Sequence, residues 1–274
     1  MELVKYLKTL IKKCFSTDTT INQETDALKQ NKPLYYTIDC DQINSFQAQQ
    51  KLLNLIKNEQ IIIFDIGAHT GTAAKEYRQI FPKSTIYCFE PFPESFKKLT
   101  NMTQNDKQIF CIKNAVSYEN SSKVFYSNSQ AATNSLFPRP KNKRRYYPKS
   151  ATPEGTIDVE TITLDNFSQA HNIQNIDILK MDIQGGELNA LKGAIDLLSS
   201  EKILIIYTEI MFVPHYEGGT LFYNLSTFLS QYGYTLYNMY NISSAGNGQV
   251  RQGDAIFISD AFRKNYLDLM DEEI

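Results

Sequence analysis

Four acidic residues each stand at the end of an apolar run, and these positions are the best placed in the sequence to do chemistry. The runs are rich in isoleucine, leucine, phenylalanine and tyrosine, a composition typical of buried strands. Ligands of open α/β sheets bind outside the carboxyl ends of the strands, where such acids can accept hydrogen bonds or protons. The four acids are Asp65, Glu90, Asp182 and Glu209.

The turn after the first of these strands has the composition of a ligand-binding turn. Gly67 lets the backbone approach a ligand closely, and the N-terminus of the helix that follows offers free N–H donors. The spacing Asp65-x-Gly67-x-x-x-Gly71 is poorer in glycine than the G-x-G-x-x-G turn that cradles a pyrophosphate in nicotinamide- and flavin-binding proteins. S-adenosylmethionine has no phosphate and carries a sulfonium cation, so a turn led by an acid favours that ligand.

Glu90 strengthens this interpretation by its distance from the turn. It follows the run Thr85–Phe89, about twenty residues on, where dinucleotide-type folds place an acid for a ribose. A carboxylate there can accept hydrogen bonds from both ribose hydroxyls, and Pro91 then turns the chain toward a helix. The two signals together predict S-adenosylmethionine as the cofactor.

Strands and helices must alternate if these acids are to share one edge of a sheet. Apolar runs predict strands over 61–66, 85–89, 108–112, 176–182 and 203–207. Helical spacing predicts helices that start near residues 73, 94, 164, 187 and 221, with the fourth running to 198. A terminal hairpin-like pair is expected at 234–237 and 254–258, joined by a loop over 241–253, and Asp254 opens its second strand. This order predicts a mostly parallel, doubly wound sheet.

The composition fits one sizeable α/β domain with additions. The chain has 274 residues and a net charge of −2 at pH 7, which does not predict a nucleic-acid partner. No apolar run approaches the roughly 20 residues needed to span a bilayer. The four cysteines, Cys14, Cys40, Cys88 and Cys111, lack the spacing of a metal site or a disulfide framework. Cys88 and Cys111 lie within strand patterns, so we expect them to be buried thiols in a reducing cytoplasm.

Residues 1–57 are predicted to form a helical extension ahead of a domain over 58–274. Glu2–Phe15 has the pattern of an amphipathic helix whose lysines lie away from its apolar face. Such a helix could lie on a membrane surface, but the favoured alternative is packing on the domain or on a second subunit, which would form a homodimer. A polar linker is predicted over 16–34, and a second helix over 41–57.

Residues 128–156 interrupt the alternation of strands and helices. The segment contains several prolines and six basic side chains between Arg139 and Lys149, with two tyrosines among them. Short strands are predicted on either side of it, over 123–126 and 156–161. A loop of this length in a compact domain is usually a lid, a binding loop or disordered. We interpret it as a substrate lid suited to an anionic or sugar-like substrate, with a solvated charge run as the alternative.

Six blocks of this sequence together resemble the FkbM family of S-adenosylmethionine-dependent methyltransferases. The resemblance covers about residues 60–260, and the blocks occur in the family's order. The chain departs from the family at His69, where Asn is usual, and at Gln184-Gly185-Gly186-Glu187, which usually reads acid-Gly-Ala-Glu. The blocks are Phe64–Gly71, Cys88–Phe96, Asn114–Ser117, Ile178–Leu188, Leu191–Ala194 and Tyr207–Ile210.

The resemblance implies both a fold and a reaction. The implied fold is a Rossmann-like, seven-stranded, mostly parallel sheet of the class I methyltransferases, with its last strand antiparallel. The implied reaction is methyl transfer to a hydroxyl oxygen of a sugar, a glycan or a natural product, which would be the small-molecule partner of the enzyme. Family and fold do not by themselves identify the acceptor.

Cofactor-binding roles can be assigned to the residues that match the family's blocks. We expect the methionine end to be bound by Asp65, Gly67, His69 and Gly71. We expect Glu90 and Pro91 beside the ribose, Asn114 and Ala115 at the adenine edge, and Asp182 next to the cofactor turn. For Asp65 the alternative is an acid that caps the following helix.

An acceptor hydroxyl is barely ionised at neutral pH, so its methylation needs a general base or a metal ion. Asp182 and Glu209 close adjacent strands and could act as base, or together could bind Mg²⁺ through oxygen ligands. His215 follows Glu209 on an expected substrate loop and is a further candidate base. The alternatives are that Asp182 caps the following helix and that Glu187 caps it rather than touching substrate.

Three other functions are compatible with parts of this pattern. The same cofactor site could methylate a nitrogen or a carboxyl group of a peptide natural product. A NAD(P)-binding Rossmann oxidoreductase is disfavoured because the third glycine of its turn is missing. A binding domain without catalytic activity is the last alternative, and it would show no loss of cofactor binding in Glu90→Ala.

Overall fold

A computed structural model describes residues 43–56, 60–140 and 152–269 of the chain. Contacts group Asn44–Asp271 into one compact unit, which contains all of the described helices and strands. The predicted helix at Glu2–Phe15, the polar linker and the dimer contact that this helix would make lie outside the described residues. Within the described part of the chain, no helix has the length and apolar character needed to cross a membrane.

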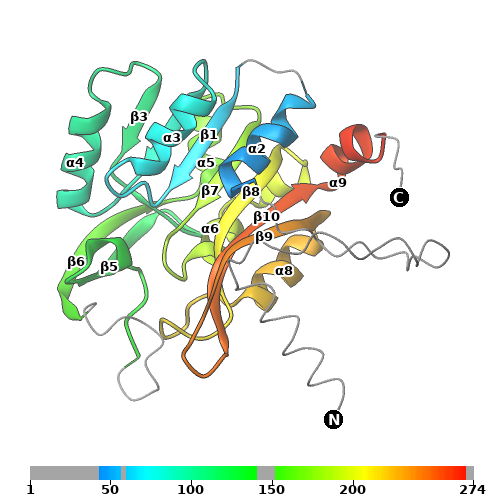
Figure 1. Cartoon of the computed structure of the whole chain (residues 1–274). Coiled ribbons are helices and arrows are strands. Elements are labelled where there is room, and N and C mark those ends of the chain that lie inside the picture. Colours follow the sequence, from blue (N-terminus) through cyan, green and yellow to red (C-terminus); the bar gives the residue numbers. More distant parts are fainter. Residues whose placement is uncertain (1–42, 57–59, 141–151, 270–274) are drawn as a thin grey trace, which may run out of the picture. The chain divides into compact units, whose positions relative to one another are not determined.

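The larger of two sheets has seven strands in the order β3-β2-β1-β7-β8-β10-β9 (Figure 1). Five strands are parallel to their neighbours, and β10 runs antiparallel to both β8 and β9. This confirms the predicted seven-stranded, mostly parallel, Rossmann-like sheet. The strands are β1 (Ile62–Ile66), β2 (Thr85–Phe89), β3 (Ile109–Ile112), β7 (Ile176–Met181), β8 (Ile203–Met211), β9 (Tyr234–Ser244) and β10 (Val250–Ser259).

Helices cover both faces of this sheet, as a doubly wound fold requires. One face packs against α2 (Ser45–Asn54), α3 (Thr72–Ile80) and α4 (Pro93–Thr103). The other face packs against α5 (Leu164–Ala170), α6 (Glu187–Lys192), α7 (Ile195–Ser199) and α8 (Phe222–Ser230). The chain leaves β10 through a short helix, α9 (Asp260–Phe262), and a π-helical turn, Arg263–Leu267.

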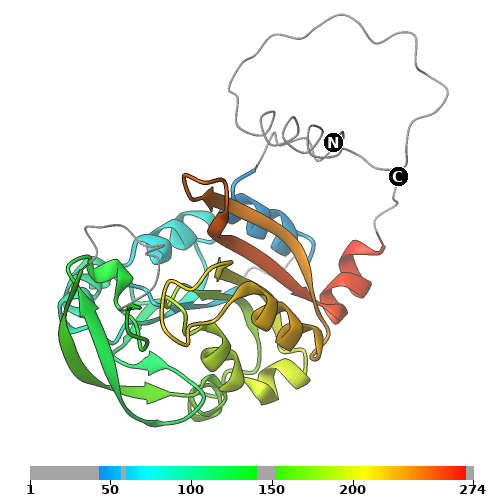
Figure 2. The same cartoon turned by 90° about the horizontal axis from the view of Figure 1, so that it is seen from below.

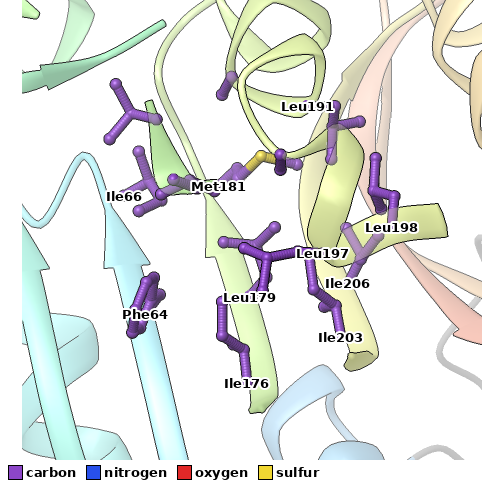
Figure 3. Packing of buried hydrophobic residues seen from close by; sticks show 14 of the residues in the cluster. Phe64, Ile66, Ile176, Leu179, Met181, Leu191, Leu197, Leu198, Ile203 and Ile206 are labelled. Carbon is purple, nitrogen blue, oxygen red and sulfur yellow. The ribbon is translucent and has the colours of Figure 1, made fainter. Parts of the chain in front are cut away.

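The central strands are almost continuously apolar because both of their faces are buried. Ile63 points into the cluster beneath α2, α3 and α4, whereas its neighbour Phe64 points into the cluster beneath α5 to α8. Figure 3 shows this second cluster, in which Leu179 and Met181 of β7 pack near Ile206 of β8. The packing holds the carboxyl ends of β1, β7 and β8 in a fixed relation to one another.

A smaller sheet flanks the segment 128–156 that was predicted to be a lid. It contains β4 (Ala115–Val116), β5 (Ser121–Asn128) and β6 (Pro153–Ile162) in the order β4-β6-β5. Figures 1 and 2 show it in green, at the opposite end of the unit from α9. Strand β6 begins within the predicted loop, and a 3₁₀ turn, Ala131–Thr133, follows β5, so 128–156 is not one irregular insertion. The basic side chains of this segment that follow Arg139 all belong to residues 141–151, which lie outside the described residues.

The single helix predicted over 187–198 is wrong, because the chain breaks at Gly193 between α6 and α7. A Cβ atom at Gly193 would lie 2.2 Å from the carbonyl oxygen of Ser117, so only glycine allows this approach. The break lets the carbonyl of Gly193 accept a hydrogen bond from the N–H of Asp165. The Asp165 carboxylate then caps α7 by accepting from the N–H groups of Asp196 and Leu197.

The loop predicted over 241–253 is also wrong, because β9 continues to Ser244 and β10 already begins at Val250. Strand β9 lies at the edge of the sheet and most of its side chains are exposed, so it lacks the alternation that marks a half-buried strand. Bulges in the pairing of β9 with β10 further obscure the pattern.

Candidate active site

A cavity of about 350 Å³ opens at the carboxyl ends of β1, β2 and β7. Its wall includes the turn after β1, the residues after β2, the start of β4 and the turn after β7. Ala131 and Leu136, which follow β5, complete one side, while Phe46 of α2 lies on another. The segment between β5 and β6 therefore contributes residues to the wall of the cavity.

The turn after β1 is held close to the neighbouring strands by backbone hydrogen bonds. The N–H groups of Gly67 and Ala68 both donate to the carbonyl oxygen of Phe89 in β2, at 2.9 and 3.0 Å. Gly67 has φ +77°, and a Cβ atom there would lie 2.1 Å from the carbonyl oxygen of Asp182. A side chain at this position would therefore separate the ends of β1 and β7 and close the cavity between them.

Glu90 faces this turn with both carboxylate oxygens engaged. Oε2 accepts a hydrogen bond from the N–H of His69 at 2.9 Å, and Oε1 accepts one from the N–H of Phe92 at 2.9 Å. The side chain lines the cavity although the residue is only 6% exposed. Burial raises the pKa of Glu90 to about 7, against the lowering effect of these two hydrogen bonds.

Not every residue that was predicted to bind the cofactor lines the cavity. His69, Pro91, Asn114, Ala115 and Asp182 line it, as do Gly67 and Glu90. Asp65 and Gly71 are not among the lining residues. Gly71 instead packs against α4, where an added Cβ atom would lie 2.0 Å from Met102 Cε.

Asp65, which is fully buried, forms an ion pair with Lys180, whose side chain is 10% exposed, and sequence reasoning missed this pair. Lys180 Nζ lies 2.8 Å from Asp65 Oδ1, and the two residues are direct register partners in β1 and β7. Lys180 also donates to the carbonyl oxygen of Gly67 at 3.2 Å and lines the cavity. Burial alone would lower the pKa of Lys180, but the carboxylate of Asp65 outweighs it and the pKa is raised, so the lysine is charged. Asp65 thus influences the cofactor turn through Lys180.

Asp182 and Glu209 are brought together, but a glutamine lies between them. Gln184 Nε2 donates to Asp182 Oδ1 at 2.7 Å and to Glu209 Oε2 at 2.8 Å. Glu209 is not among the residues that line the cavity, and its other oxygen accepts from Gln252 Nε2 at 3.1 Å. Burial, and after it the nearby charge of Asp182, raise the pKa of Glu209 well above its usual value.

This arrangement does not fit the predicted Mg²⁺ site. Among the described residues, no group of three or more histidines, cysteines or acids could hold a metal ion. The point between the two carboxylates faces the N–H₂ group of Gln184, which is a donor and cannot coordinate a cation. The sequence suggested a metal because it placed two acids at adjacent strand ends, without showing which group lies between them.

His215 and Glu187 are both buried away from the cavity wall. Burial and the nearby Arg251 and Arg139 lower the pKa of His215 to about 4, and the residue is not among those that line the cavity. Glu187 Oε1 accepts hydrogen bonds from the N–H groups of Ile183 and Gly185, so its carboxylate is held against the turn that precedes α6 and not against the N–H groups of α6 itself. Burial raises the pKa of Glu187 to about 7.

Tyr207 and Asp254 also line the cavity; the sequence placed them only at the end of one strand and at the start of another. The hydroxyl of Tyr207 donates to Asp254 Oδ2 at 3.1 Å and accepts from Ser45 Oγ at 3.0 Å. Asn241 Nδ2 donates to the same oxygen of Asp254 at 2.6 Å. Asp254 lies opposite Glu209 in the pairing of β10 with β8, and this antiparallel register is the signal that could have placed it.

A seven-stranded sheet with one antiparallel strand, and an acid-lined cavity at the ends of β1 and β2, define an S-adenosylmethionine-dependent methyltransferase of class I. The family described as "Methyltransferase FkbM domain" matches residues 65–236, and the chain belongs to this family.

Known proteins similar to this chain include two methyltransferases from microorganisms. The chain is 30% identical over 183 residues to the 2-O-methyltransferase NoeI of Sinorhizobium fredii, a match that covers 64% of this chain and 73% of NoeI. It is 23% identical over 168 residues to the hexuronic acid methyltransferase AglP of Haloferax volcanii, which covers 60% of this chain and 64% of AglP. Among solved structures, M. capricolum TrmK with S-adenosyl-homocysteine is similar at a TM-score of 0.41 and 13% identity, covering 77% of this chain and 68% of TrmK.

Proposed function

We propose that this methyltransferase acts on a hydroxyl of a sugar or of a sugar-containing natural product, with Asp182 as its general base. The observation that carries the proposal is the position of Asp182, whose carboxylate lines the same cavity as Glu90 at the carboxyl end of β7. The relatives support the choice of acceptor, since the name of one specifies 2-O-methylation and the name of the other specifies hexuronic acid.

The residues of the cavity fit S-adenosylmethionine in size and in charge. A volume of about 350 Å³ lies in the range of roughly 300–1,000 Å³ that is usual for ligand pockets. Four acids line the cavity and only one lysine does, which favours a cofactor that carries a sulfonium and an ammonium group. The acids are Glu76, Glu90, Asp182 and Asp254, and the lysine is Lys180.

Each part of the cofactor can be assigned to a part of the cavity wall. Gly67 and His69 border the methionine end, Glu90 and Pro91 the ribose, and Asn114 with Ala115 the adenine edge. In this assignment Asp65 acts through Lys180, and Gly71 acts by allowing α3 to pack on α4. The free carboxylate lone pairs of Glu90 would accept the two ribose hydroxyls.

Asp182 would perform the proton transfer that makes a hydroxyl nucleophilic. When bound, S-adenosylmethionine supplies an electrophilic methyl group on a positively charged sulfur. Asp182 would take the hydroxyl proton while the acceptor oxygen attacks the methyl group that the cofactor supplies, and the electron pair of the carbon–sulfur bond would leave with sulfur. Gln184 and the end of β7 hold the carboxylate in place for this step.

The charge of the cavity also bears on the alternative acceptors. The acids that line the wall would repel a carboxylate placed at the reacting position, which favours methylation of a hydroxyl over a carboxyl group, and a uronic acid would have to bind with its carboxylate turned away from these acids. Hydroxyl groups, in contrast, donate hydrogen bonds to carboxylates. Methylation of a nitrogen remains the second candidate, because an amine would also be attracted to this wall.

The test is methyl transfer to a panel of neutral glycosides, uronic acid glycosides and amines, followed as release of S-adenosylhomocysteine. We expect turnover with a glycoside, and a loss of kcat of about 10²–10⁴-fold in Asp182→Asn, the usual contribution of a general base. Asp158→Asn is the matched control, because Asp158 is exposed on β6. Wild-type kcat in Asp182→Asn would exclude this residue as the base, and turnover of amines alone would exclude the hydroxyl acceptor.

Two further proposals concern the surroundings of the enzyme. We propose a cytoplasmic location, supported by Cys88 and Cys111, which are both free thiols in the described part of the chain. The homodimer through the N-terminal helices is tested by light scattering of the full chain, in which a monomer at all concentrations would exclude it.

A further inference from the structure

We propose that Gln184 is a positioning residue whose amide takes the place of a divalent cation between Asp182 and Glu209, so that the enzyme needs no metal ion. This inference rests on the proposed role of Asp182 as the base. It explains how two acids at adjacent strand ends can lie close together, and it assigns a function to a residue that lines the cavity without being able to act as a base.

All hydrogen-bonding groups of the Gln184 side chain are used. The two hydrogens of Nε2 point one to Asp182 Oδ1 and one to Glu209 Oε2, at 2.7 and 2.8 Å. Oε1 accepts from the hydroxyl of Tyr216 at 2.7 Å. This network also fixes the orientation of the amide, because the reversed amide would place Oε1 against two carboxylates.

The backbone of Gln184 is held by contacts as specific as those of its side chain. Its φ is +55°, in the left-handed region that is unfavourable for a residue with a Cβ atom. Ser135 Oγ donates to its carbonyl oxygen at 2.8 Å, and the Tyr216 hydroxyl that contacts its amide also lies 2.8 Å from the carbonyl of Thr133. Strained residues that the surrounding structure holds in place are common at active sites.

Tyr216 is itself fixed on the far side of this network. It is 1% exposed, and the guanidinium of Arg139 lies over its ring at 4.1 Å from the centroid. A continuous set of contacts therefore runs from Arg139 through Tyr216 and Gln184 to the carboxylate of Asp182. Such a set fixes the direction of the carboxylate toward the cavity, which is what a general base requires.

The chain offers an isosteric variant and a matched control. Gln184→Glu keeps the size of the side chain but replaces the donor between the two acids by a third carboxylate, which creates the oxygen-rich set that Mg²⁺ prefers. Gln252→Glu adds the same charge beside Glu209, but on the side of Oε1, which faces away from the shared amide. Only the first variant should gain a response to a divalent cation.

Two measurements test the proposal. One is the melting temperature with MgCl₂, MnCl₂ or EDTA, which is independent of the acceptor and therefore of the proposed function. The other is kcat with the glycoside found above, with the affinity for S-adenosylhomocysteine measured alongside. For the wild type we expect no effect of chelator or cation on either quantity. For Gln184→Glu we expect kcat to fall at least tenfold in EDTA and to recover with Mg²⁺, with a rise in melting temperature on adding the cation.

Two results would overturn the proposal. One is wild-type activity that is lost on chelation and restored by Mg²⁺, and the other is Gln184→Glu with wild-type kcat in EDTA. If Gln184→Glu does not fold, Gln184→Ala replaces it: lower kcat with unchanged S-adenosylhomocysteine affinity supports a positioning role, and unchanged kcat rejects it. If the wild type methylates no acceptor, the proposed function fails, while the thermal measurements still decide whether the amide excludes a cation.

Discussion

Glu90 should make cofactor binding depend on pH near neutrality. The carboxylate must be ionised to accept hydrogen bonds from both ribose hydroxyls, but burial raises its pKa to about 7 in the free protein. A group with this pKa is about nine-tenths ionised near pH 8 and about one-tenth ionised near pH 6. We therefore expect the Kd for S-adenosylhomocysteine to rise about tenfold between these pH values, a change of about 1.4 kcal/mol.

Glu90→Gln should remove this pH dependence and weaken binding near pH 8, where the wild-type carboxylate is ionised. One oxygen of Glu90 accepts a hydrogen bond from the N–H of His69 and the other accepts one from the N–H of Phe92. In glutamine an NH₂ group replaces one of these oxygens, so it would face a backbone N–H donor without forming a hydrogen bond. A lost hydrogen bond to a charged group costs about 1.5–3 kcal/mol, which corresponds to roughly 10- to 150-fold in Kd near pH 8.

The assay is isothermal titration of S-adenosylhomocysteine into the wild type and variants over this pH range. Glu94→Gln is the control, because Glu94 lies in the first turn of α4 and is exposed. It should retain both the affinity and the pH dependence of the wild type. The reasoning is refuted if the wild-type Kd is constant over this range, or if Glu90→Gln keeps the same slope against pH.

Three other changes have outcomes that the structure specifies. Gly67→Ala should lower the melting temperature and abolish cofactor binding, since its Cβ atom would meet a backbone oxygen at 2.1 Å; Gly246→Ala, with nothing within 4 Å, should not. Asp65→Asn should cost about 3–5 kcal/mol in urea unfolding because it leaves Lys180 buried without its counter-ion, and a loss below about 1 kcal/mol would contradict this. The raised pKa of Glu187 means that the fold holds its proton more tightly than the unfolded chain, so its contribution to stability is lost as pH rises from about 4.5 to about 7. Glu187→Gln, whose single amide oxygen can keep both backbone contacts, should be more stable than the wild type above pH 7 by roughly 3 kcal/mol, and equal stability there would contradict the assignment.

The order of the main sheet could be predicted because its signals are local. Apolar runs, the turn at Gly67 and the acid at Glu90 each identify a strand end without knowledge of the rest of the chain. The strands predicted over 123–126 and 156–161 lie within β5 and β6, but their pairing into a separate sheet was not predicted, because β5 is half-exposed and β6 is mostly exposed. The position of Asp254 in the cavity wall likewise depends on a non-local feature, the antiparallel register of β10 that places it opposite Glu209.

Gln184 shows how a departure from a family's pattern can carry information that the pattern lacks. At the level of sequence, a glutamine in a block that usually has an acid only put the role of this position in doubt. In the structure its amide separates two carboxylates, and a glutamate there would add a third negative charge at the same point. This site therefore carries one negative charge fewer than it would carry in a chain with an acid at position 184.

Asp65 marks the limit of reading function from the position of an acid at a strand end. An aspartate in an otherwise apolar strand and a lysine in another are each costly to bury alone, because an isolated charge loses its hydration. Pairing them removes most of this cost, and β1 and β7 place Asp65 directly opposite Lys180. The lysine then holds the carbonyl of Gly67. The acid that seemed to be a ligand for the cofactor is thus the counter-ion of the residue that shapes the cofactor turn, and only the pairing of two strands distant in sequence reveals it.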